Sequence, residues 1–137
     1  MKSMAKSQQK ESQAHLLYTI REVMLLERIA FGRKVLAFME PFTLCVIYSA
    51  RPGGRAAFLQ EIEKSGVLNA IHAEEGCLKY AYCPSTADAE TLVLLEQWAS
   101  HAHQQAHLKQ PHMARLREIK ERYIETTQVG IVTFNDA

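Results

Sequence analysis

The spacing of hydrophobic residues changes along the chain, and each change marks a predicted element. Residues 42–50 are apolar and β-branched and stop at a Pro-Gly-Gly turn, which predicts a buried strand. Residues 55–75 repeat apolar positions at helical spacing, although Ser65 and Gly66 weaken the middle of the pattern. Residues 42–75 are therefore predicted to form a strand followed by a helix.

Two further strands follow this helix. Residues 77–83 alternate between apolar and polar side chains, which predicts a strand with Leu78, Tyr80 and Tyr82 on one face. Residues 91–98 follow after a short loop and predict an antiparallel neighbour. The residues that share one face of this second strand are Leu92, Leu94, Glu96 and Trp98.

Two short helices and a last strand complete the pattern. Ser100 is a suitable N-cap for a helix that ends near Leu108, and Pro111 suits the first turn of a second helix that runs to about Tyr123. Residues 126–134 predict the final strand. The order βαββααβ predicts an α+β, ferredoxin-like domain whose second helix is broken at Pro111. Because its helices cover one face of the sheet, we expect the other face to pair with a second copy.

The N-terminal part has a different pattern, which divides the chain into an extension (residues 1–40) and a domain (residues 41–137). Residues 1–13 are almost all polar and predict a mobile tail, whereas residues 14–39 favour a helix with a wide apolar sector. Three interpretations stay open for this helix. It docks on the domain or a partner, it lies on a membrane surface, or the natural protein starts at Met39.

Composition and charge exclude several classes of protein. The chain has 137 residues, which fits one domain and an appendage, and its net charge of +1 gives no field that would attract nucleic acid. No uncharged stretch is long enough to span a bilayer, so no membrane-spanning segment is expected, and a membrane is not an expected partner. The three cysteines show no CxxC spacing and indicate a reduced, cytoplasmic protein. Phosphate-loop, dinucleotide-binding and GxSxG motifs are absent from the sequence.

Histidines are the main candidates for chemistry, because four of the six fall within residues 101–112. His103 and His107 are four residues apart, a spacing found in helical metal sites. The segment lacks the glutamate of HExxH, and no acidic residue lies between Gln97 and Pro111 to complete a ligand set. We therefore expect no metal here.

His112 and Glu96 are the strongest candidates for proton transfer. His112 shares a helical stripe with apolar residues and is expected to face inward, either as a proton acceptor or as a hydrogen-bonded core residue. Glu96 lies on an apolar strand face, where a carboxylate must find a partner or acquire a raised pKa. Tyr80, Tyr82 and Trp98 are suited to the walls of an aromatic pocket.

Four segments together resemble a known family. The strings RPGGRAAFLQEI, AEEGCLKYAY, LLEQW and AHLKQPHMARL, in this order, are similar to the antibiotic biosynthesis monooxygenase domain over about residues 42–134. The resemblance implies a homodimer built as an α+β barrel, with a pocket between sheet and helices in each subunit. It also implies a cofactor-independent enzyme of the quinol monooxygenase or autoinducer-degrading type. Related haem degraders carry an axial histidine where this chain has Arg117, so haem is not expected.

These observations predict an enzyme that oxidises a small phenolic or quinol-type molecule with O2 and without a cofactor. The expected catalytic residues are His112 or His72 as base and Glu96 as orienting partner. The residues expected to bind substrate are Tyr80, Trp98, His107 and Tyr82. Two alternatives stay open. One is an isomerase for a small hydroxy-ketone, in which Lys79 and Arg51 bind an anionic group, and the other is a non-catalytic dimeric interaction module.

Overall fold

The computed structural model describes residues 22–136, which contain a helix over residues 22–39 followed by the predicted domain. The chain divides into two compact units between Ala37 and Phe38, and each unit is considered by itself. The predicted tail, residues 1–13, and the start of the predicted N-terminal helix lie outside the described residues. Within residues 22–136, none of the helices combines the length and the apolar character needed to cross a membrane.

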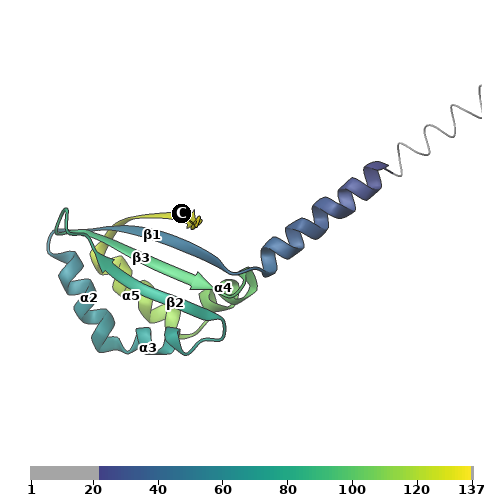
Figure 1. Cartoon of the computed structure of the whole chain (residues 1–137). Helices are drawn as coiled ribbons and strands as arrows, with labels where there is room; N and C mark the ends of the chain where they lie inside the picture. Colours follow the sequence, from purple (N-terminus) through teal and green to yellow (C-terminus); the bar gives the residue numbers. More distant parts are fainter. Residues whose placement is uncertain (1–21, 137) are drawn as a thin grey trace, which may run out of the picture. The chain divides into compact units, whose positions relative to one another are not determined.

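The domain is a four-stranded antiparallel sheet with helices on one side (Figure 1). Its strands, in the spatial order β2-β3-β1-β4, are β1 (Phe42–Ala50), β2 (Cys77–Pro84), β3 (Thr91–Trp98) and β4 (Ile124–Val132). Its helices are α2 (Gly54–Ser65), α3 (Val67–His72), α4 (His101–Leu108) and α5 (His112–Tyr123). This arrangement confirms the predicted α+β, ferredoxin-like fold.

The core lies between the sheet and helices α2 and α5. Residues of β3 alternate between buried and half-buried, so one face of the strand is fully covered. Phe58 and Ile62 of α2 and Ile119 of α5 are almost completely buried against this face. The same face carries Glu96, which places a carboxylate beside the apolar core.

The predicted helix over residues 55–75 is wrong in its continuity and its end. It is split into α2 and α3 at Gly66, whose φ of 73° is a left-handed conformation that glycine adopts easily. Helix α3 ends at His72, so Glu74 and Glu75 lie in the connection to β2. The break in the hydrophobic pattern at Ser65 and Gly66 therefore marks the end of α2.

The predicted face of β2 is also wrong in one residue. The register of β2 against β3 shifts between Cys77 and Lys79, so Leu78 has no partner residue and is 54% exposed. Tyr80 and Tyr82 lie opposite Glu96 and Leu94 and keep the predicted orientation toward the helices. A β-bulge of this kind inserts one residue and changes which side chains share a face.

Polar contacts fix the start of α2. At its start, the Arg55 guanidinium donates Nη1–H bonds to the carbonyl oxygens of Ser85 (3.0 Å), Asp88 (2.8 Å) and Thr91 (3.1 Å). The Glu90 carboxylate accepts bonds from the backbone N–H groups of Gly53 and Arg55. The loop between β2 and β3 is thereby tied to the first turn of α2.

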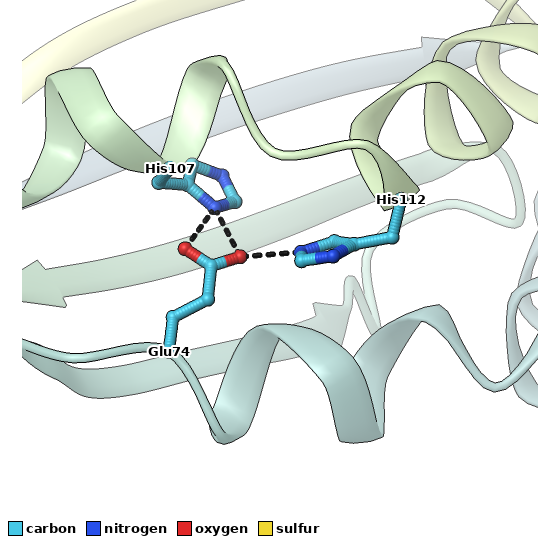
Figure 2. Close-up of side chains that lie close together, drawn as sticks. All are labelled: Glu74, His107 and His112. Atoms are coloured by element: carbon cyan, nitrogen blue, oxygen red, sulfur yellow. Dashed lines mark hydrogen bonds and ion pairs between the residues drawn. The ribbon is translucent and has the colours of Figure 1, made fainter.

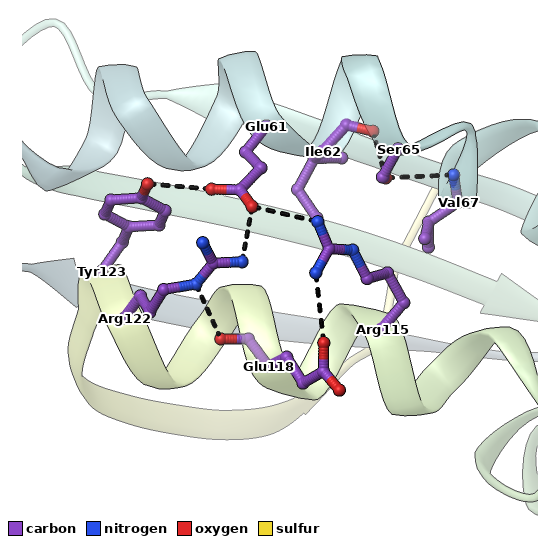
Figure 3. A network of polar contacts seen from close by, with 8 residues as sticks. All are labelled: Glu61, Ile62, Ser65, Val67, Arg115, Glu118, Arg122 and Tyr123. Atoms are coloured by element: carbon purple, nitrogen blue, oxygen red, sulfur yellow. Dashed lines mark hydrogen bonds and ion pairs between the residues drawn. The ribbon is translucent and has the colours of Figure 1, made fainter.

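Further along α2, Glu61 connects this helix to α5 (Figure 3). Its carboxylate accepts a bond from the Tyr123 hydroxyl at 2.8 Å and pairs with Arg122 and Arg115 at 2.5 and 3.2 Å. The bond from Tyr123 and the two guanidinium groups lower the pKa of Glu61. Two of the cations of α5 are therefore neutralised on the side of the domain that faces α2.

Candidate active site

A cavity of about 300 Å³ lies between the sheet and helices α4 and α5. Its apolar wall comes from β1, β4, α4 and α5, and each of the four strands and both helices also contributes a polar group. The lining residues that carry the argument below are Tyr48, Tyr80, Glu96, His107, Arg117 and Lys120. The volume is at the lower end of the range for small-molecule sites and suits a ligand of one or two rings.

A carboxylate and two imidazoles meet beside this cavity (Figure 2). Both oxygens of Glu74 lie 3.0 Å from His107 Nδ1, and Oε1 lies 2.5 Å from His112 Nε2. The side chains are well shielded, with exposed fractions of 7% for Glu74, 1% for His107 and 22% for His112. Glu74 comes from the connection between α3 and β2, and the histidines from the end of α4 and the start of α5.

These contacts determine which ring nitrogens carry protons. An ionised carboxylate only accepts hydrogen bonds, so His107 Nδ1 and His112 Nε2 must both be donors. In a neutral His107 the proton is then on Nδ1, and Nε2 is the basic nitrogen. Among residues 22–136, Nε2 of His107 has no hydrogen-bond partner, and His107 lines the cavity whereas His112 does not.

Aromatic rings hold His107 in place. The indole of Trp98 lies 4.6 Å from the imidazole, centroid to centroid, and the Tyr80 ring lies 5.7 Å away. Together with the bonds to Glu74, these contacts restrict the ring to one orientation. A preorganised base loses little free energy in reaching its working geometry.

Glu96 is the second ionisable group of the cavity wall. Its Oε2 accepts a hydrogen bond of 3.0 Å from the indole N–H of Trp98, and the residue is buried. Burial raises the pKa of Glu96, while the bond from Trp98 and the charges of His107 and Lys120 oppose that rise. The structure thus gives Glu96 the hydrogen-bond partner that its apolar strand face requires, and its role in proton transfer stays a prediction.

Glu96→Gln is expected to stabilise the protein at neutral pH. Because the pKa of Glu96 is raised on folding, its protonated form is favoured in the folded state, and stability is lost as the pH rises through that pKa. Glutamine resembles the protonated acid and still accepts the Trp98 bond. Thermal denaturation should show variant and wild type converging near pH 4 and separating as the pH rises. A difference independent of pH would contradict this explanation.

The structure brings together only part of the predicted site. Tyr80, Glu96 and His107 line the cavity, and His112 contacts it indirectly through Glu74. The other predicted residues lie outside the lining. These are Trp98 and Tyr82, which pack behind it, and His72, whose Nε2 lies 2.8 Å from the carbonyl oxygen of Tyr80.

Lys79 and Arg51, considered for an isomerase, are also absent from the cavity lining. Conversely, four residues at the site were not predicted from the sequence, namely Glu74, Tyr48, Arg117 and Lys120. Tyr48 shares a strand face with Val46, and Lys120 lies one helical turn after Leu116, so their positions follow from periodicity. Nothing in the local sequence pattern distinguishes Glu74 from Glu75.

The triad of Glu74, His107 and His112 is also the one group of ligand atoms in residues 22–136 that converges closely enough to hold a metal ion. The sequence shows no acidic residue near these histidines along the chain, but the fold brings Glu74 to His107 and His112. In the structure the three side chains bind one another directly, and this satisfies the carboxylate without an ion. The mechanism proposed below uses them in that form.

Comparison with known proteins identifies the fold family. Residues 41–119, more than half of the chain, match the family model described as antibiotic biosynthesis monooxygenase. The chain belongs to this family. The resemblance seen in the sequence is thereby confirmed, and the matched range contains Glu74, Glu96, His107 and His112.

Individual relatives agree with the family. The chain is 34% identical over 96 residues to the probable quinol monooxygenase YgiN of Escherichia coli K12, which covers 59% of this chain and 90% of that protein. Among solved structures, PA3566 from Pseudomonas aeruginosa superposes with a TM-score of 0.62 at 23% identity, covering 72% of this chain and 98% of the other. Rv0793 from Mycobacterium tuberculosis gives 0.60 at 22% identity, with coverages of 72% and 98%. These two structures support the family fold.

Proposed function

We propose that the protein is a monooxygenase that oxidises a small phenolic or quinol-type molecule with O2 and without a bound cofactor. The observation that carries this proposal is the His107 imidazole, oriented by Glu74 on the wall of a cavity that also contains the buried Glu96. The probable quinol monooxygenase among its relatives supports the substrate class. A cytoplasmic location stays a prediction.

In the proposed reaction His107 acts as the base, in place of the His112 or His72 expected from the sequence. His107 Nε2 accepts a phenolic proton, and the resulting anion transfers an electron to O2. The two radicals combine at a ring carbon that carries hydrogen, forming a peroxide. The protonated His107 returns its proton to the outer peroxide oxygen and then accepts the ring hydrogen as a proton, which breaks the O–O bond and leaves a carbonyl group. The departing hydroxide takes up that proton and leaves as water. The substrate provides all four electrons, so no external reductant is needed.

The direct test is oxygen uptake by chelator-treated protein with a panel of quinols and polyphenols. We expect enzyme-dependent uptake above autoxidation, with one oxygen atom of ¹⁸O₂ in the product. Flat traces over the panel would contradict the proposal. Incorporation of solvent deuterium at a substrate carbon without O2 consumption would favour an isomerase.

We also propose a homodimer formed through the sheet face that the helices leave uncovered. Ile47 of β1 is exposed, and Val93 and Leu95 of the neighbouring strand β3 are half-buried, and all three alternate with buried residues. An apolar surface of this kind is typical of an interface between copies of one chain. We infer further that residues 1–40 are an extension that the domain does not need in order to fold.

Deletion of residues 1–37 is therefore expected to leave a folded dimer. The deletion keeps Phe38, whose ring stacks on His101 at 5.4 Å, so the packing around α4 is preserved. Light scattering after size exclusion should give twice the mass of the shortened chain. Tm should change by only a few degrees, which corresponds to a change of about 1 kcal/mol or less in the free energy of unfolding. A shortened protein that becomes monomeric would instead show that the N-terminal helix drives assembly.

A further inference from the structure

The four cations of α5 fall into two groups. Arg115 and Arg122 pair with Glu61 on α2, as described above. Arg117 and Lys120 form no ion pair with any of residues 22–136, and both line the cavity. Helix α5 therefore presents ion-paired cations toward α2 and two cations without an ion pair toward the cavity.

Lys120 is the more enclosed of the two. It is half-buried, and its ammonium lies 4.8 Å from the centroid of the Tyr48 ring. Burial lowers the pKa of Lys120, and the charge of Glu96 partly restores it. This ammonium has lost water on burial, and it lies over an aromatic face without a direct ion pair to any carboxylate in the described residues.

Arg117 and Lys120 lie where the cavity adjoins a second hollow. Arg117, Lys120 and Thr127 also line an adjoining hollow of about 260 Å³, whose further residues are Glu121 and Ile124. Glu121 is the single carboxylate in that lining, against two cations. A ligand whose ring occupies the cavity can thus place a polar substituent beside both positive charges.

We propose that Lys120 and Arg117 form a subsite for a carboxylate on the substrate, so that the enzyme prefers aromatic acids with a phenolic or quinol ring over neutral quinols. This inference rests on the proposed function for the role of the ring. A carboxylate supplies the charge-assisted hydrogen bonds that the two side chains lack. It also compensates the cost of removing Lys120 from water.

Binding of a matched pair of ligands tests the subsite without turnover. 1-Hydroxy-2-naphthoate and 1-naphthol differ by one carboxylate, and isothermal titration calorimetry at pH 7 measures both. We expect the naphthoate to bind the wild-type protein at least about tenfold more tightly. Lys120→Met should weaken naphthoate binding about tenfold and naphthol binding less than twofold, while Lys120→Arg should restore most of the preference.

Two further variants separate the subsite from overall charge. Arg117→Gln should weaken naphthoate binding by a smaller factor, since Arg117 is exposed. Lys64→Met removes one positive charge from the exposed side of α2 and should leave both affinities unchanged. Circular dichroism confirms that each variant is folded.

The outcomes distinguish this inference from the proposed function. Equal affinities for the two ligands, an equal loss of both in Lys120→Met, or no binding of either at millimolar concentration would overturn the carboxylate subsite. Selective binding that depends on Lys120, without oxygen uptake from any quinol, would support the subsite and reject the oxidation. Oxygen uptake by the wild-type protein with equal binding of the two ligands would support the oxidation and reject the subsite.

Discussion

His107→Ala is expected to reduce oxygen uptake with quinols by about 100- to 10,000-fold, the range that a general base contributes. The imidazole is the single one in the cavity lining within residues 22–136, and its Nδ1 is already engaged by Glu74. Uptake under saturating substrate measures the effect on kcat. The variant should bind 1-hydroxy-2-naphthoate almost as the wild type does, because Lys120 and Arg117 are intact.

The matched control is His103→Gln, one helical turn earlier on α4. His103 bonds to Ser100 through Nδ1 at 2.7 Å and is absent from the cavity lining. Its replacement should leave uptake within about twofold of the wild type, since no proposed step involves it. Equal losses in the two variants would indicate damage to α4, and preserved uptake in His107→Ala would remove His107 from the mechanism.

Glu74→Ala is expected to have the second largest effect, on both stability and turnover. The substitution leaves His107 Nδ1 and His112 Nε2 without their acceptor in a shielded site, which costs about 3 kcal/mol of unfolding free energy. The neighbouring Glu75 is 95% exposed. Glu75→Ala should therefore change stability by no more than about 0.5 kcal/mol. Denaturant unfolding of the two variants measures the difference.

Kinetics separate the positioning role of Glu74 from a purely structural one. Glu74 is absent from the cavity lining, so its loss should lower kcat by about tenfold to a hundredfold and change KM little. Glu74→Gln keeps an oxygen acceptor and should recover part of both stability and kcat. A loss of stability in Glu74→Ala with normal kcat for the folded fraction would show that Glu74 only holds the structure together.

Much of the fold could be predicted from local patterns, because side-chain periodicity reports which face of an element is buried. Alternation over residues 91–98 correctly put Glu96 on one face with Leu92, Leu94 and Trp98, but did not show that the helices cover this face. Ser100 does cap α4 by accepting a bond from the backbone N–H of His103. The bulge at Leu78 was missed because its insertion depends on pairing with β3, which leaves no trace in the period of a single strand.

Local patterns predicted less of the candidate site, because the contact between its residues joins distant parts of the chain. His107 and Glu96 were singled out because imidazoles and buried carboxylates are conspicuous, but the search for a partner was confined to the same segment. The partner of His107 is Glu74, 33 residues earlier in the chain, in a connection that follows no periodic pattern. Contacts between such distant residues are a property of the topology, so only the fold could show that Glu74 and His107 meet.

The contacts of Arg55 are expected to make the loop between β2 and β3 resistant to proteases. Exposed polar loops are the usual sites of cleavage, because a protease must draw an extended segment of chain into its cleft. Here that movement would break the bonds from the Arg55 guanidinium to Ser85, Asp88 and Thr91. Trypsin must bind the Arg55 side chain to cleave after it, and in the folded domain that side chain is hydrogen-bonded to the loop. The preceding basic residue, Arg51, is followed by Pro52, which blocks cleavage there. The turn that starts α2 therefore offers trypsin no open bond while the domain is folded.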